Sequence, residues 1–235
     1  MTIAVDGKPV MTRSILASPC KIIGLVDGTS YTATASAVNK TGVGLPSDPV
    51  SFVTSSLPGP PTAVLATAGY QSASVSFSPP ADTGGTPVTS YKVIAVPSGV
   101  TVTATSSPVT VTGLPPGSIS TFNVYAINAM GRGKASMASN RVLPYAEPGV
   151  PTINSVTAGP GSASISFSPP ISNGGSQITS YTVTSDPDGI TALGTTSPVT
   201  VAGLTAGTPY VFSITATNIG GTGLTSSPSK AVSPL

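Results

Sequence analysis

Two stretches alternate small polar and apolar side chains without a break: Ser-Ala-Ser-Val-Ser-Phe-Ser at residues 72–78 and Ser-Ala-Ser-Ile-Ser-Phe-Ser at residues 162–168. Successive side chains of a β-strand point to opposite faces, so a period of two predicts strands with one buried face and one wet face. Residues 181–184 and 210–216 alternate in the same way. Turn clusters such as Gly84-Gly85 separate these segments. The pattern predicts an all-β chain without helices, with about seven short strands in each full unit, as in a β-sandwich.

These segments belong to an internal repeat. The repeat has an offset of about 90 residues, which suits a domain with its own core and is too long for a solenoid repeat. Positions that recur in all three copies are Ser18-Pro19, Ser107-Pro108 and Ser197-Pro198; Gly24-Leu25, Gly113-Leu114 and Gly203-Leu204; and Asn39, Asn128 and Asn218. The repeat predicts three units: a first unit (residues 1–56), a second unit (residues 57–146) and a third unit (residues 147–235). Short Pro-rich segments at 57–61 and 147–151 join them and predict fairly stiff hinges.

Composition excludes several classes of function. The net charge is only +2 and charged residues make up 7% of the chain, so nucleic acid is not an expected partner. No apolar run approaches the roughly 20 residues that would span a membrane, and the N-terminus lacks the pattern of a signal peptide. The chain has no histidine and a single cysteine, Cys20, which removes Ser-His-Asp and Cys-His chemistry and a disulfide framework. We therefore expect no catalytic residues, no metal site and no cofactor.

The order of motifs in the second and third units resembles a known family. Ser-Phe-Ser-Pro-Pro, Gly-Gly, Tyr, Ser-Pro-Val-Thr-Val-x-Gly-Leu and Ala-x-Asn-x-x-Gly follow one another, and the third unit adds Gly-Thr-Pro-Tyr before the last of these. This series is similar to fibronectin type III domains of the bacterial and phage type. The resemblance implies tandem immunoglobulin-like sandwiches of about seven strands without enzymatic activity.

The chain departs from the family pattern at several positions. Phe77 and Phe167 stand where the family usually has tryptophan. The tyrosine of the family's tyrosine corner maps to Tyr31 and Tyr210, but the second unit has Ser120 there, so we expect Phe122 to supply the packing instead.

The first unit is incomplete by the same comparison. Tyr91 of the second unit aligns with Thr2, so the first unit begins inside the third strand of the sandwich and lacks the first two. Apolar residues of its inner face would then lack part of their cover, namely Ile22, Leu25, Ala33, Ala35 and Ala37. Two interpretations remain open: the chain is a fragment of something longer, or another chain donates the missing strands to residues 1–54.

Few other side chains point to chemistry. Asp186 and Asp188 lie in one turn, which favours a polar turn over a calcium loop or a glycosidase pair. Cys20 aligns with Val109 and Val199, so a small core residue is the preferred interpretation. Asn39-Lys40-Thr41 forms a glycosylation sequon, but Asn39 is also a repeated position with a structural explanation.

The outward faces of the predicted sheets differ between units. The third unit places Thr182, Thr184, Thr215 and Thr217 on this face, which is a soluble surface. The first two units carry apolar and basic residues instead, and such patches mark partner contacts. The predicted partner-contact face comprises Lys92, Ile94, Tyr125 and Ile127 with Ile3, Val5 and Val38. A possible second contact is the basic loop of Met130, Arg132 and Lys134.

These features favour a non-enzymatic structural or adhesive module. Its partners would be other protein chains on a cell surface, a virion or an extracellular filament. The alternative is a spacer or carbohydrate-contacting appendage of a secreted polysaccharide-degrading enzyme. Direct sugar binding is disfavoured because the chain has no tryptophan, and fold alone does not choose between the two.

Overall fold

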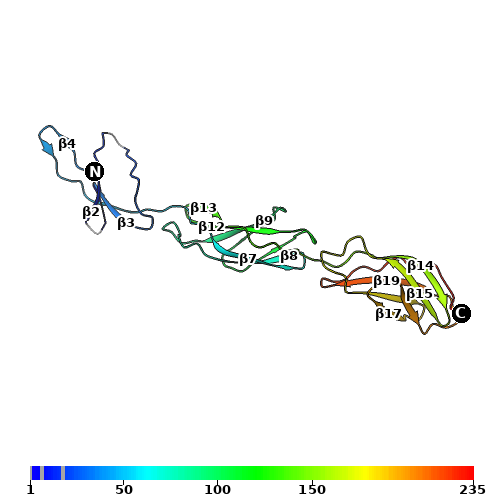
Figure 1. Ribbon diagram of the computed structural model, residues 1–235. Helices are drawn as coiled ribbons and strands as arrows, with labels where there is room; N and C mark the ends of the chain where they lie inside the picture. Colours follow the sequence, from blue (N-terminus) through cyan, green and yellow to red (C-terminus); the bar gives the residue numbers. More distant parts are fainter. Residues whose placement is uncertain (1, 6–7, 17–18) are drawn as a thin grey trace.

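The computed structural model describes residues 2–5, 8–16 and 19–235. The three units follow one another in an elongated array, with the N-terminus near one end and the C-terminus at the other (Figure 1). All regular elements within the described residues are strands, so the prediction of an all-β chain is confirmed. Ser18 and the side chains of Ile3 and Val5 lie outside the described residues.

The second unit is a two-sheet sandwich of seven strands, the number that the turn spacing predicted. One sheet has the order β11-β8-β7 and the other the order β10-β9-β12-β13. The strands are β7 (Thr62–Gly69), β8 (Ser72–Ser78), β9 (Ser90–Val96), β10 (Thr101–Ala104), β11 (Val109–Thr112), β12 (Thr121–Asn128) and β13 (Gly131–Ala135).

The third unit repeats this architecture with seven further strands. Its sheets have the orders β14-β15-β18 and β17-β16-β19-β20. The strands are β14 (Thr152–Gly159), β15 (Ser162–Ser168), β16 (Ser180–Asp186), β17 (Thr191–Gly194), β18 (Val199–Ala202), β19 (Val211–Asn218) and β20 (Gly221–Thr222). Matching topology in the two units explains why so many sequence positions recur.

The core follows the alternation of the sequence. In β8 the side chains of Ala73, Val75 and Phe77 are buried while the intervening serines face outward or are half-buried. Phe77 packs on Tyr91 of the opposite sheet with ring centroids 4.8 Å apart, and the equivalent pair in the third unit, Phe167 and Tyr181, lies at 4.6 Å. The phenylalanine that stands in place of tryptophan is therefore paired with an aromatic ring across the sandwich.

The repeated Ser-Pro motif lies just before β11 and β18 and is hydrogen-bonded to this core. The hydroxyl oxygen of Ser107 accepts a hydrogen bond from the Phe77 amide at 2.9 Å, and Ser197 accepts one from Phe167 at the same distance. Proline at the next position continues the chain without a free amide, which a neighbouring strand would otherwise have to satisfy. The repeat of Ser-Pro is thus a hydrogen-bonding requirement of the sandwich.

The tyrosine corners predicted at Tyr31 and Tyr210 are present. The Tyr31 hydroxyl accepts a hydrogen bond from the Val26 amide at 2.9 Å, and that of Tyr210 accepts one from the Thr205 amide at 3.2 Å. At the same position, Ser120 is buried and exchanges only backbone hydrogen bonds with Val142.

Phe122 does not substitute for the missing corner in the second unit. Its side chain is fully buried, but so is that of Phe212, which occupies the same position in the unit that retains its tyrosine. The second unit therefore lacks the hydroxyl contact and gains no aromatic group in exchange.

The first unit has a different arrangement. Its strands are β1 (Thr2–Val5), β2 (Lys8–Thr12), β3 (Ser30–Thr34), β4 (Val38–Asn39), β5 (Gly42–Val43) and β6 (Val50–Val53). Within its described residues they form one four-stranded sheet, β2-β1-β3-β6, and a separate β4-β5 hairpin. Tyr31 is buried and stacks on Phe52 with centroids 5.9 Å apart, whereas Ala35 and Ala37 are exposed.

The register of β1 also differs from the repeat. Thr2 lies opposite Thr34, whereas the pairing of Tyr91 with Ala126 in the second unit would place Thr2 opposite Ala37. The counterparts of Ala35 and Ala37 in the second unit, Val124 and Ala126, are fully buried under the opposite sheet. The exposure of the two alanines reflects the single-sheet arrangement of the first unit.

Replacing Tyr210 with phenylalanine tests the corner. The change leaves the Thr205 amide without its acceptor and removes the hydrogen bond that the Tyr210 hydroxyl donates to Asp188, at 2.6 Å. We expect the third unit to lose about 1–3 kcal/mol of unfolding free energy. Native-state hydrogen exchange of the Phe212 and Ile214 amides would measure this loss for the third unit alone. Exchange rates equal to those of the wild type would contradict the role assigned to the hydroxyl.

Candidate functional site: the domain junctions and the sheet face of the second unit

The first and second units meet through close contacts between their backbones. Gly84 and Gly85 lie in the turn between β8 and β9, and a Cβ on Gly84 would stand 2.3 Å from the carbonyl oxygen of Ser56. A Cβ on Gly85 would stand 2.3 Å from the amide nitrogen of Gly28 in the first unit. The Ser56 amide donates to the Gly84 carbonyl oxygen at 2.8 Å. Only glycine allows this approach, so the Gly-Gly pair is an element of the junction.

A repeated asparagine closes the junction from the other side. The Asn128 amide group donates to the carbonyl oxygens of Ser56 and Thr83, at 2.8 and 2.9 Å, and so joins the linker to the turn before Gly84. Its side-chain oxygen accepts a hydrogen bond from the Met130 amide at 2.9 Å. One buried side chain therefore satisfies three backbone groups from three segments, a fully paired polar network in a water-poor position.

The second junction repeats the first. Asn218 donates to the carbonyl oxygens of Ala146 and Asn173, at 2.9 and 2.7 Å. A Cβ on Gly174 would meet the Ala146 carbonyl oxygen at 2.2 Å, and one on Gly175 would meet the Gly117 amide nitrogen at 2.4 Å. Two junctions built from the same contacts indicate a fixed geometry between successive units.

An additional contact holds the second linker. The Tyr70 hydroxyl, from the hairpin between β7 and β8, donates a hydrogen bond to the Glu147 carboxylate. This bond lowers the pKa of Glu147 and raises that of Tyr70, because it stabilises the charged carboxylate and the protonated phenol. The Gln71 amide also donates to the Tyr145 carbonyl oxygen at 2.7 Å. The hairpin between β7 and β8 thus binds the chain at Tyr145 and at Glu147, where the linker begins.

The outward face of the second unit brings the predicted contact residues together. Between β12 and β9, Tyr125 lies opposite Lys92. Between β12 and β13, Ile127 lies opposite Arg132. Ile94 of β9 lies opposite Asn123 of β12 and Thr101 of β10. The side chains of Lys92, Ile94, Tyr125 and Ile127 are half-buried, and the Arg132 guanidinium carbon stands 4.6 Å from the centroid of the Tyr125 ring. This cation–π contact fixes the arginine over the apolar face.

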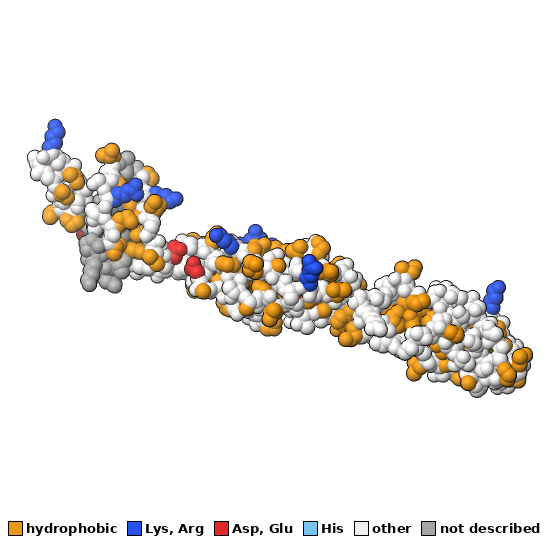
Figure 2. Space-filling model, viewed as in Figure 1, with side chains coloured by type: hydrophobic (Ala, Val, Ile, Leu, Met, Phe, Trp, Pro, Cys, Tyr) orange, Lys and Arg blue, Asp and Glu red, His pale blue; other side chains and the backbone are white. Residues whose placement is uncertain are grey.

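Figure 2 shows several Lys and Arg side chains among apolar side chains on the second unit, whereas the third unit is largely uncharged. The equivalent positions of the third unit are threonines, with Thr182 opposite Thr215 and Ser180 opposite Thr217. The same backbone therefore presents two chemically different faces in adjacent units.

The remaining predicted residues lie apart from this face. Val38 is exposed in the β4-β5 hairpin of the first unit, and register places Ile3 opposite Ala33. Met130 and Lys134 are exposed near Arg132 at the edge strand β13. The structure groups Lys92, Ile94, Tyr125, Ile127 and Arg132, and it places Val38 in a different unit.

The remaining candidate residues from the sequence are Asp188, Cys20 and Asn39, and the contacts give Asp188 and Asn39 structural roles. Asp188 accepts the hydrogen bond from Tyr210, so its carboxylate holds the turn after β16. Cys20 is half-buried. Asn39 caps its own turn by accepting hydrogen bonds from the amide and hydroxyl of Thr41, at 2.9 and 2.6 Å. Within the described residues, no three His, Cys, Asp or Glu side chains lie where they could hold a metal ion.

Sequence reasoning missed the junctions as a functional feature. The recurring Gly-Gly and Asn positions were visible as repeats, but nothing local in the sequence shows that their partners belong to the linker and to the preceding unit. The glycine pairs at 84–85 and 174–175 and the asparagines at 128 and 218 lie far in sequence from the predicted hinges at 57–61 and 147–151, so their recurrence gave no sign of a junction.

The fold and its junctions define a tandem array of β-sandwich domains. The family model for the fibronectin type III domain matches residues 59–142 and 148–232, more than half of the chain. The chain belongs to the fibronectin type III family. Domains of this kind typically have no catalytic activity, commonly mediate protein interactions and are commonly extracellular.

One similar solved structure is the crystal structure of the FN1–FN3 domains of chicken CNTN1. It shares 19% sequence identity with a TM-score of 0.40, over 91% of this chain and 79% of that chain. No helix in the described parts of this chain is long and apolar enough to cross a membrane.

Substituting Gly85 with alanine tests the junction. The new Cβ would collide with the Gly28 amide, and the matched variant Gly113→Ala, at φ +74° with nothing within 4 Å, separates this clash from backbone strain at φ +75°. Both variants bear the left-handed cost of about 1–2 kcal/mol. We expect Gly85→Ala to lose about 1.4 kcal/mol more than Gly113→Ala, because it also breaks junction contacts. Protease should then cleave residues 54–61 about tenfold faster in Gly85→Ala than in Gly113→Ala. Equal cleavage rates in the two variants would show that the contact does not fix the junction.

Proposed function

We propose that this chain is a structural or adhesive module of an assembly at a bacterial cell surface, a virion or an extracellular filament. The observation that carries the proposal is the outward face of the second unit. Ile94, Tyr125 and Ile127 are apolar and half-buried, with Lys92 opposite Tyr125 and Arg132 opposite Ile127, where the third unit has threonines. A face that mixes aromatic, aliphatic and arginine side chains is typical of contact sites between proteins.

The junctions support an array whose units keep a set spacing. Each linker is held by backbone hydrogen bonds and by an asparagine that binds two carbonyl oxygens. A chain with flexible linkers would present its faces in random directions, whereas a fixed junction presents them at constant separation. Constant separation lowers the entropy cost of binding several sites on a neighbour at once.

The first unit supports a role in assembly through its exposed inner face. Ala35 and Ala37 are exposed at positions where the second unit has fully buried side chains. A neighbouring chain that supplied strands to residues 1–54 would cover this face and pair the free edge of the sheet. We therefore propose strand donation by another protein chain as the contact made by the first unit.

Changing Ile94 and Ile127 to threonine tests the face of the second unit. The double variant gives this face the chemistry of the third unit, and loss of two apolar contacts should weaken self-association at least about tenfold. The matched control is Ile119→Thr with Ile171→Thr, which makes the same two changes at exposed positions outside the face. Light scattering over a range of concentrations measures the association. Equal association of the two double variants would contradict the proposal.

Removing residues 1–57 tests strand donation. We expect light scattering to show stronger concentration-dependent association for the whole chain than for residues 58–235, which keep only the face of the second unit. Residues 1–54 of the whole chain should become more resistant to protease as concentration rises, because association covers their open face. If both chains are monomers and residues 1–54 are cleaved equally fast at every concentration, the array is a passive spacer, as in an appendage of a polysaccharide-degrading enzyme.

A further inference from the structure

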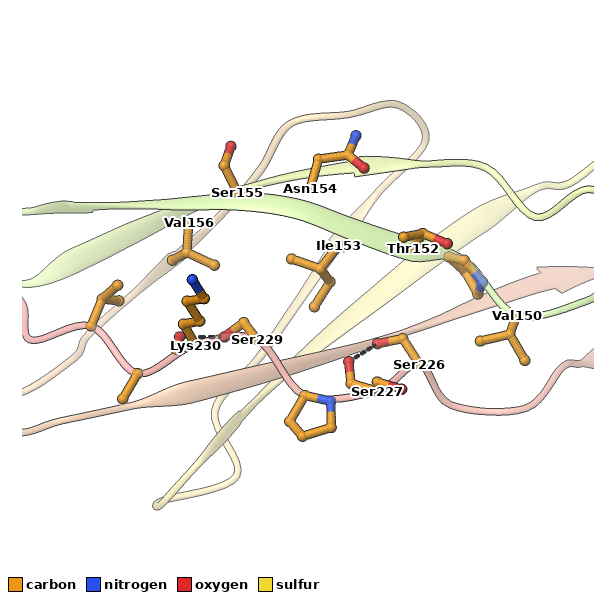
Figure 3. Close-up of a pocket in the computed structure, with 14 residues that line it drawn as sticks. Val150, Thr152, Ile153, Asn154, Ser155, Val156, Ser226, Ser227, Ser229 and Lys230 are labelled. Atoms are coloured by element: carbon orange, nitrogen blue, oxygen red, sulfur yellow. Dashed lines mark hydrogen bonds between the residues drawn. The ribbon is translucent and has the colours of Figure 1, made fainter.

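A groove of about 730 Å³ opens along one side of the third unit. One wall is the edge of β14 with the residues just before it, and the other is the segment Ser226–Val232 (Figure 3). Ile153 and Val156 project into the space from β14, and Lys230 projects from the facing segment. The volume falls within the roughly 300–1,000 Å³ typical of ligand sites.

The second unit shows what closes this groove in a sister domain. There the Asn140 side chain binds the backbone of Ala66 twice: its oxygen accepts from the Ala66 amide at 2.8 Å, and its amide group donates to the Ala66 carbonyl oxygen at 2.9 Å. The two contacts fasten the segment after β13 to the edge of β7. Ala66 is buried as a result.

The third unit carries lysine at the position of that asparagine. Lys230 and Val156 occupy the repeat positions of Asn140 and Ala66, and Val156 pairs with Ile165 as Ala66 pairs with Val75. A lysine has no acceptor atom, so it cannot bind a backbone amide as the asparagine oxygen does. Val156 is only half-buried. Its outward amide and carbonyl therefore face the groove as a free strand edge.

The charge at the groove favours a negatively charged ligand. Lys230 is the only ionisable side chain among the residues that line it, and it is the only Lys or Arg of the third unit. Apolar side chains and serine hydroxyls make up most of the remaining lining. A free strand edge, an apolar floor and one cation together match an extended chain that carries a carboxylate.

We propose that the groove binds an extended peptide segment of another protein chain, with its backbone on the β14 edge at Val156 and an acidic side chain on Lys230. The strand edge supplies affinity through main-chain hydrogen bonds, and the lysine selects for a carboxylate. This site lies in a different unit from the face of Ile94 and Ile127, so loss of either site leaves the other in place.

Exchanging the residues at positions 140 and 230 between the second and third units tests the proposal. The probe is the capped peptide Thr-Val-Glu-Val-Thr-Val, titrated into isotope-labelled full chain and followed through the backbone amide signals of Val156 and Lys230. Lys230→Asn installs the closure seen in the second unit and should weaken binding at least tenfold. Lys230→Ala removes the lysine side chain and its charge without installing that closure, and it should weaken binding less. Asn140→Lys should open the corresponding edge and create a second responsive region at Ala66.

The matched peptide with glutamine in place of glutamate tests the carboxylate, and we expect it to bind at least threefold more weakly to the wild type. Thermal unfolding checks that each variant is folded, and Lys230→Asn should raise the melting temperature of the third unit. Absence of signal changes with the wild type, or equal binding by wild type and Lys230→Asn, would overturn the peptide site. Equal binding of the two peptides would overturn the role of Lys230, and binding of digalacturonate instead of the peptides would reassign the groove to acidic sugars.

Discussion

The contact between a Gly-Gly turn and the linker that precedes it is the constraint on which the array depends. At each junction a backbone carbonyl oxygen lies only 2.2–2.3 Å from the point where a Cβ on the first glycine of the pair would stand. Because the approach is between two backbones, the geometry does not rely on long side chains that could adopt other rotamers. The asparagines that bind the same linkers complete the contact with short, directional hydrogen bonds.

This constraint separates two tasks that each unit performs. The interior and the ends of the second and third units are closely similar, because the core alternation, the Ser-Pro hydrogen bond and the glycine turns recur in both. The outward sheet faces and the groove beside β14 lie away from these contacts. Their residues can therefore differ between units without changing the spacing, and they do, at Ile94 against Thr184 and at Asn140 against Lys230.

Much of the fold could be predicted from the sequence because its signals are local. Alternation in residues 72–78 predicted a strand and its buried face, and the family resemblance predicted a tyrosine corner at Tyr210, whose hydroxyl accepts a hydrogen bond from the amide five residues upstream. The junctions could not be predicted, since Asn128 binds Ser56 and Thr83, which lie 72 and 45 residues away. The groove escaped notice for a similar reason. Lysine and asparagine are both ordinary surface residues, and only the contact between Asn140 and Ala66 shows what the exchange removes.

The first unit shows how far the repeat alone determines structure. Its tyrosine corner forms with the same spacing as in the third unit, because that contact joins residues only five apart. Its sheet register departs from the repeat, with Thr2 opposite Thr34. In the complete units the register is fixed by burial against an opposite sheet, since a slip of one residue would turn the apolar side chains outward. The strands β1, β2, β3 and β6 of the first unit form a single four-stranded sheet and so lack that restraint, which leaves the sequence of the strands insufficient to set their pairing. A second sheet supplied by a neighbouring chain would restore the restraint, so strand donation would set the register as well as cover the face.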